Sequence, residues 1–134
     1  MEKTQQRNLV LILARELAAN SATAMFVVDP EGTLVFFNEP AESVLGRSFA
    51  ETGALTPSEW GAMFEPKDGN GMAIPIEQLP LTKALRDLQP GHITMDITGL
   101  DGDRKTIEVT AIPLFARADE FVGAVAIFWE AGKP

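Results

Sequence analysis

The sequence predicts an α+β domain in which two strands, a helical middle and three further strands follow an N-terminal helix. Three observations lead to this prediction. Residues 4–19 contain many good helix formers and no Gly or Pro. Residues 92–98 and 106–112 alternate apolar and polar side chains, as half-buried antiparallel strands do. The apolar runs in 24–37 and 121–129 supply the remaining strands, and 134 residues fit one domain.

The first element is the predicted helix over residues 4–19, which Asn20 and Ser21 are placed to end. Its apolar side chains wrap too far around the helix to form a single stripe facing one core. Part of this helix surface therefore needs a second partner.

The next segment is predicted to be a hairpin followed by a short helix. The run AMFVVD (24–29) is typical of a buried strand, residues 30–32 supply a turn, and residues 33–37 form the second strand. Asn38 stands where the strand stops, and its side chain can accept hydrogen bonds from backbone N–H groups two or three residues further on. We therefore interpret Asn38 as a structural helix cap, with Gly46 ending the helix.

The middle of the chain is predicted to be irregular up to a short helix. Residues 47–80 hold four prolines and four glycines, which favour short helical turns joined by loops. Residues 81–88 then place Leu81, Ala84, Leu85 and Leu88 on one helical face.

Three strands complete the prediction. The first two are 92–98 and 106–112, joined by a turn at Asp101-Gly102 and ending before Pro113. The last, 121–129, is apolar on both faces, so we expect it in the centre of the sheet with cover on each side.

This order of elements, together with the residues at the joints, resembles the PAS sensor domain. The segment DPEGTLVFFNEPAESVLG is similar to the opening block of that family, and DGNGMAIPIEQLPLTKAL is similar to a stretch of many bacterial members. LDGDRKTIEVTAIPLF and FVGAVAIFWE match the closing strands. The resemblance covers roughly residues 21–130 and implies a five-stranded antiparallel sheet with short helices across one face. We therefore expect an N-terminal extension (1–20), a PAS domain (21–131) and a short tail (132–134).

The resemblance also implies where a ligand would lie, between the inner face of the sheet and the helices. Apolar residues of the strands and helices would line this place, and such stripes are usually core packing, so a filled core and a vacant pocket both remain open. No cofactor is predicted, and a small apolar ligand remains a candidate. The expected pocket residues are Trp60, Met63, Leu81, Leu85, Ile93, Met95, Ile97, Ile107 and Val109.

Haem and flavin are both disfavoured. Some PAS domains bind haem through a histidine, usually on the helix that corresponds to residues 79–88, and this helix has none. His92 is the only histidine, and alternation places it on the polar strand face, opposite Met95. Flavin photochemistry of the kind seen in light-sensing relatives needs a cysteine, and the chain has none.

Other sites are also disfavoured. The run Asp68-Gly69-Asn70-Gly71 lacks the ligand spacing of a calcium loop, so a turn explains it better and no metal is predicted. No motif of an enzyme active site appears. Asp96 and Glu108 can meet across two strands, but alternation places them on the solvated face.

Composition limits the partners. A formal net charge of −8 works against binding to nucleic acid or to anionic lipid. The longest N-terminal apolar run, 9–14, is too short to span a bilayer, and no signal peptide is predicted, so we expect a cytoplasmic protein.

Taken with the resemblance, these observations predict a non-catalytic sensor or interaction module of signal transduction. Its output would pass through an unidentified downstream protein or through further domains of a longer sensor. In the PAS family an N-terminal helix commonly packs on the outer sheet face or against a second subunit. We expect a homodimer, with a helix that merely covers its own sheet as the alternative. The expected dimer contacts are Leu9, Val10, Ile12, Leu13 and Leu17.

Overall fold

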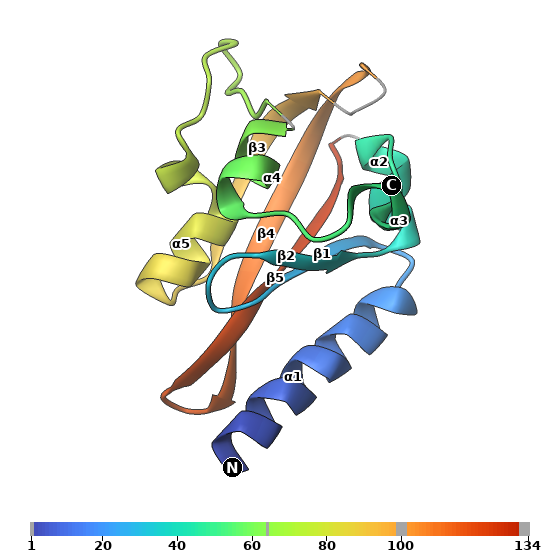
Figure 1. Ribbon diagram of the computed structural model, residues 1–134. Coiled ribbons are helices and arrows are strands. Elements are labelled where there is room, and N and C mark those ends of the chain that lie inside the picture. Colours follow the sequence, from blue (N-terminus) through green and yellow to red (C-terminus); the bar gives the residue numbers. More distant parts are fainter. Residues whose placement is uncertain (1, 64, 99–101, 132–134) are drawn as a thin grey trace.

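The computed structural model describes residues 2–63, 65–98 and 102–131, and these form helices on both sides of one antiparallel sheet (Figure 1). In chain order the elements are α1 (Glu2–Ala19), β1 (Ala24–Val28), β2 (Leu34–Phe37), α2 (Glu39–Leu45), α3 (Phe49–Thr52), α4 (Pro57–Met63), the 3-10 helix η1 (Ile76–Gln78), α5 (Pro80–Asp87), β3 (Gly91–Thr98), β4 (Arg104–Arg117) and β5 (Glu120–Glu130). The predicted α+β class and strand count are confirmed.

The sheet has five strands in the spatial order β2-β1-β5-β4-β3. All neighbouring strands are antiparallel. The last strand, β5, joins the hairpin β1–β2 to the β3–β4 pair, with Ala24 opposite Phe128 and Val28 opposite Ala124. The central position that the sequence predicts for this strand is therefore confirmed.

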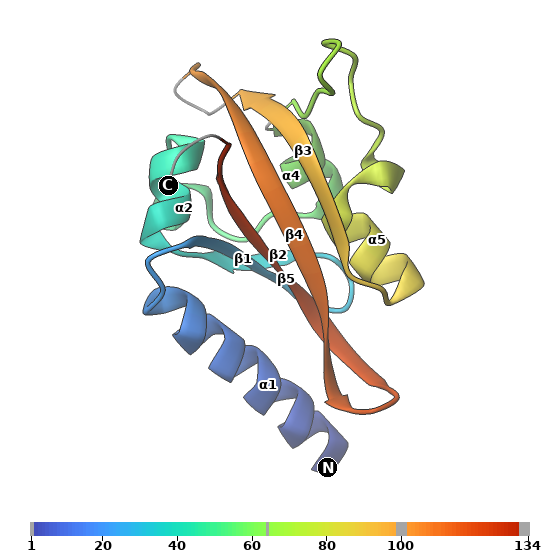
Figure 2. The same cartoon turned by 180° about the vertical axis from the view of Figure 1, so that it is seen from behind.

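The two faces of the sheet carry separate hydrophobic clusters. On the inner face, side chains of the strands pack against α2, α4, α5 and the short segments around them, and this cluster includes Phe26, Phe37, Trp60 and Phe128. On the outer face, α1 crosses the sheet and packs Ala14 and other side chains against it (Figures 1 and 2). The inner layer positions the candidate site, and the outer layer positions α1.

Gly123 lets the central strand, its neighbour and α1 approach one another closely. Its φ is +143°, and a Cβ atom there would lie 2.4 Å from the carbonyl oxygen of Val28 and 3.0 Å from Cδ2 of Leu11. Any side chain would therefore push β5 away from β1 and lift α1 from the sheet.

Two predicted element ends were wrong. Strand β4 does not stop before Pro113 but continues to Arg117. The pairing of β3 with β4 runs only as far as Ala111, so Pro113 lies where β4 has a single neighbour, a position at which a missing N–H is tolerated. Leu88, expected on the apolar face of α5, follows the helix in a left-handed conformation (φ 56°) and is 42% exposed. The predicted Asp101-Gly102 turn lies partly outside the described residues.

Candidate functional site

A small cavity lies between the inner face of the sheet and the helices. Its volume is about 60 Å³, and its wall is almost entirely apolar. Strands β1, β3, β4 and β5 supply one side, and α2, α4, Pro66 and the start of α5 supply the other. The lining residues are Phe26, Leu45, Trp60, Pro66, Leu79, Pro80, Leu81, Met95, Ile97, Ile107, Val109, Ala126 and Phe128.

Most of the residues expected to form a pocket surround this cavity. Those in its wall are Trp60, Leu81, Met95, Ile97, Ile107 and Val109. Leu85 instead packs against the edge of the inner core, and Ile93 is half-buried without lining the cavity. The side chain of Met63 lies outside the described part of the structure.

Several lining residues were missed by sequence reasoning. Ala126 and Phe128 lie on β5 and Phe26 on β1, both of which are apolar on both faces. A period-two pattern assigns a face only where polar and apolar residues alternate. Ala124, Ala126 and Phe128 are spaced two residues apart, so they had to share one face of β5. Nothing in the sequence of β5 indicated whether that face or the opposite one points inward.

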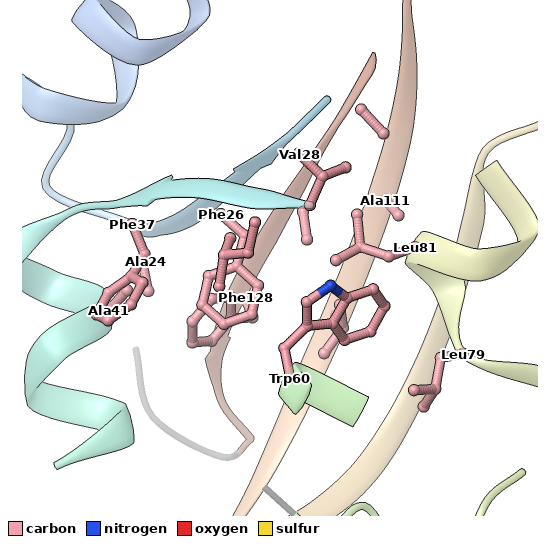
Figure 3. Close-up of a cluster of buried hydrophobic side chains, with 14 of the residues drawn as sticks. Ala24, Phe26, Val28, Phe37, Ala41, Trp60, Leu79, Leu81, Ala111 and Phe128 are labelled. Atoms are coloured by element: carbon pink, nitrogen blue, oxygen red, sulfur yellow. The ribbon is translucent and has the colours of Figure 1, made fainter. Parts of the chain in front are cut away.

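Trp60 fixes the helical side of the cavity. Its indole is buried and points toward the sheet, near Leu81 and Phe128 (Figure 3). The indole Nε1 donates a 2.9 Å hydrogen bond to the carbonyl oxygen of Gly32, in the turn between β1 and β2. Gly32 has a φ of +88°, and a Cβ atom there would lie 2.9 Å from Cγ of Pro57, so the turn approaches α4 as closely as only glycine allows. The one polar atom of the indole is thus satisfied outside the cavity.

Asn38 connects α1, β1 and α2. It is 1% exposed, and its Oδ1 accepts from the backbone N–H of Ala41, which is the cap of α2 that the sequence predicts, and from that of Met25. Its Nδ2 donates to the carbonyl oxygens of Ala18, at the end of α1, and of Thr23. Asn38 therefore ties the last turn of α1 to the first strand as well as capping a helix.

Helix α1 is apolar on two opposite sides. Leu11, Ala14 and Ala18 pack against the outer face of the sheet. Of the residues expected at a dimer contact, Val10 is half-buried, and four others are between 54% and 65% exposed. These four are Leu9, Ile12, Leu13 and Leu17, which we call the exposed α1 face.

Phe36 shows how α1 is held at the edge of the sheet. The guanidinium of Arg15 lies 5.1 Å from the centre of the Phe36 ring, a cation–π contact. This contact anchors one flank of α1 without covering the exposed α1 face.

The polar side chains of His92, Asp96 and Glu108 lie on the outward face of the sheet. His92 is paired through Nδ1 with the hydroxyl of Thr110 (2.6 Å) and through Nε2 with the carboxylate of Glu108 (3.3 Å). Asp96 accepts a 2.6 Å hydrogen bond from the hydroxyl of Thr106. Met95 lines the cavity on the other face, so His92 and Met95 do not share a site. This arrangement gives the cavity no acid, base or nucleophile from His92, Asp96 or Glu108.

The resolved shifts in pKa belong to helix caps rather than to the cavity. The backbone N–H of Ser48, followed by its hydroxyl, lowers the pKa of Glu51 at the start of α3. Thr56 lowers the pKa of Glu59 in the same way at the start of α4. Within the described residues, no cluster of three or more His, Asp or Glu side chains is arranged to hold a metal ion.

The sequence model of the PAS fold family matches residues 13–129. Among solved structures, the chain is similar to a PAS domain from Colwellia psychrerythraea (16% identity, TM-score 0.58, covering 93% of this chain and 99% of the other). It is also similar to the PAS domain of an HTR-like protein from Haloarcula marismortui (17%, TM-score 0.59, covering 96% and 98%).

A third similar structure is the LOV protein of Rhodobacter sphaeroides (15% identity, TM-score 0.69, covering 99% of this chain and 70% of the other). None of the curated protein sequences that were compared matches the chain. In the described part of the chain, no helix is both long and apolar enough to cross a membrane. Because the family match covers well over half of the sequence, the chain belongs to the PAS fold family, a family of sensor and interaction modules in signalling proteins.

Proposed function

We propose that the chain is a non-catalytic cytoplasmic signalling module that works as a homodimer. It responds to a small ligand or to a partner at its inner side, and it relays the change through the sheet and α1 to a downstream protein. The observation that carries this proposal is the exposed α1 face, which lies opposite the side of the helix that already covers the sheet.

The exposed α1 face supports self-association. Leu9, Leu13 and Leu17 follow one another at four-residue spacing, with Ile12 beside them, so they form a continuous apolar strip along the helix. A symmetric dimer brings the same strip from two copies together, and each then covers the other. Glu16 and Asn20 are exposed near the end of this strip and suit the wet rim of an interface.

The strand β5 supports a relay between the two faces. Its Ala126 lines the cavity, and its neighbour Val125 belongs to the outer cluster under α1. A change in packing around Ala126 on the inner face therefore shifts Val125, against which α1 packs on the outer face, because the two are adjacent residues of one strand. Biasing such a two-state packing requires a differential interaction of only a few kcal/mol.

Non-catalytic function is supported by the chemistry of the two faces. The cavity wall offers apolar side chains, and the outward carboxylates of Asp96 and Glu108 are engaged with Thr106 and His92. Catalysis by proton transfer or nucleophilic attack needs polar groups that converge on the reacting atoms.

A second candidate is an interaction module that binds no ligand. The small volume of the cavity, about 60 Å³, favours it. It shares the homodimer and the downstream partner with the first proposal and differs only at the inner side, so ligand binding separates the two.

Sedimentation equilibrium of the wild type and of Leu13→Glu tests the homodimer. Leu13 is 57% exposed, and dimerisation would bury it in both copies. Burying a leucine contributes about 1.5–3 kcal/mol, so losing roughly half of that value in each copy weakens dimerisation by at least about tenfold. The introduced charges add to this loss.

Met72→Glu is the matched control, because Met72 is 65% exposed and lies on the loop before η1, away from α1. We expect this variant to dimerise like the wild type. A wild type that remains monomeric at high concentration, or a Leu13→Glu variant that dimerises as well as Met72→Glu, would overturn the proposal.

A further inference from the structure

The wall of the inner cavity limits the chemistry of any ligand. Trp60 Nε1 is already bonded to Gly32, and the lining side chains of β3, β4 and β5 are aliphatic, aromatic or thioether groups. A ligand in this cavity would find no charged partner and no strong hydrogen-bond donor on the surrounding side chains. Charged or strongly polar groups would lose their hydration without compensation.

The volume limits the size of the ligand. An engineered apolar cavity of about 150 Å³ takes up benzene or xenon and otherwise stays dry. The cavity here, at about 60 Å³, is less than half as large. The cavity is large enough to hold water, yet water needs two to four polar partners, and this wall does not supply them.

The walls favour polarizable, apolar guests. The rings of Phe26 and Phe128 lie 5.0 Å apart in an edge-to-face arrangement, and Met95 adds a polarizable thioether. Dispersion contacts with such groups are individually weak but add up over the apolar wall that a guest touches.

We propose that the inner cavity binds a small, uncharged, apolar molecule of roughly two to four heavy atoms, such as a nonpolar gas or a short hydrocarbon. The inference rests on the proposed sensing function and specifies its ligand class. Flavins and haem are too large for this class, and carboxylates fall outside it because they are charged.

The test uses the wild-type chain with xenon and, separately, propane as probes, followed by NMR of carbon-13-labelled methionine methyl groups. Met95 is half-buried and lines the cavity, whereas Met25 is buried in the outer cluster under α1. We expect a saturable shift of the Met95 methyl with one site per chain and no matching shift of Met25.

Two variants locate the site independently. Ala126→Val adds two methyl groups to the cavity wall, and Val125→Ile adds one methyl group to the next residue, on the opposite face of β5. We expect the saturable response to xenon to be lost in Ala126→Val and kept in Val125→Ile. Circular dichroism establishes that both variants fold. The NMR measurement of the methionine methyl groups uses the wild type and does not depend on either variant.

The outcomes are separable from those of the homodimer. No saturable shift at Met95, or equal shifts at Met25 and Met95, overturns the cavity proposal and leaves a ligand-free dimeric module. Tight binding of flavin mononucleotide or haem overturns the ligand class alone. If the chain binds xenon but sediments as a monomer, the cavity proposal is supported and the proposed homodimer is overturned.

Discussion

Replacing Asn38 with alanine removes a buried side chain that makes four hydrogen bonds to three parts of the fold. On its acceptor side, the N–H of Met25 is left buried without a side-chain partner, which costs about 1–3 kcal/mol. The N–H of Ala41 loses its helix cap, worth about 0.5–2 kcal/mol.

On the donor side, two backbone carbonyls lose a partner. Each such hydrogen bond contributes about 0.5–1.5 kcal/mol net. The loss at Ala18 falls near the lower end, because its carbonyl oxygen still accepts from the N–H of Ser21 at 3.1 Å. For the whole side chain we expect a loss of roughly 3–6 kcal/mol, against a total stability of about 5–15 kcal/mol for a typical domain.

Urea denaturation at 25 °C, followed by circular dichroism, measures this loss. The matched control is Asn20→Ala, because Asn20 is exposed and donates one side-chain hydrogen bond to the carbonyl oxygen of Glu16. We expect the control to lose less than about 1 kcal/mol. If Asn38→Ala loses no more free energy of unfolding than Asn20→Ala, the assigned role of the network is wrong.

Asn38→Asp separates the donor side from the acceptor side. The substitution keeps Oδ1 but turns a second oxygen toward the carbonyl oxygens of Ala18 and Thr23. The ionised form is disfavoured in the fold, which raises its pKa above the unfolded value. The loss of stability caused by the charged aspartate is therefore absent below the unfolded pKa, and it grows as the pH rises toward the folded pKa. If the difference in free energy of unfolding between Asn38→Asp and the wild type does not shrink on acidification, this reasoning is wrong.

Two further changes test individual contacts. Trp60→Phe leaves the carbonyl of Gly32 without its indole donor, so we expect a loss of about 1–3 kcal/mol in urea denaturation, and unchanged stability would argue against the contact. Glu51→Gln removes a carboxylate whose pKa is lowered by the backbone N–H and hydroxyl of Ser48. The stabilising effect of this carboxylate is present above the unfolded pKa and is lost as the pH falls through the folded pKa. We therefore expect the variant to have a lower urea midpoint than the wild type near pH 7 but the same midpoint in acid. A pH-independent difference would contradict the capping role.

Asn38 illustrates what local sequence can predict. Its bond to Ala41 spans three residues and follows from the change from strand to helix. Its bonds to Met25, Thr23 and Ala18 span 13, 15 and 20 residues and depend on the packing of α1 beside β1. Capping chemistry is readable along the chain, whereas the role of the same residue as a tertiary link is not.

The candidate site shows a similar division. Alternation in β3 and β4 placed Ile93, Met95, Ile97, Ile107 and Val109 on one face, and all of these except Ile93 line the cavity. Strands β1 and β5 are covered on both sides, so their composition does not show which of their residues face the cavity. The extension of β4 through Pro113 was missed for a related reason, since the tolerance for proline depends on where the neighbouring strand stops pairing.

Hydrogen–deuterium exchange of α1 as a function of protein concentration tests the proposed dimer most directly, without any substitution. A second copy that covers Leu9, Leu13 and Leu17 would suppress local opening of α1, so we predict slower exchange of its amides at higher concentration. The amides of β1, inside the sheet, serve as the internal reference. Exchange of α1 that is independent of concentration, over a range in which β1 is also unchanged, would contradict the proposal that a second copy covers this helix.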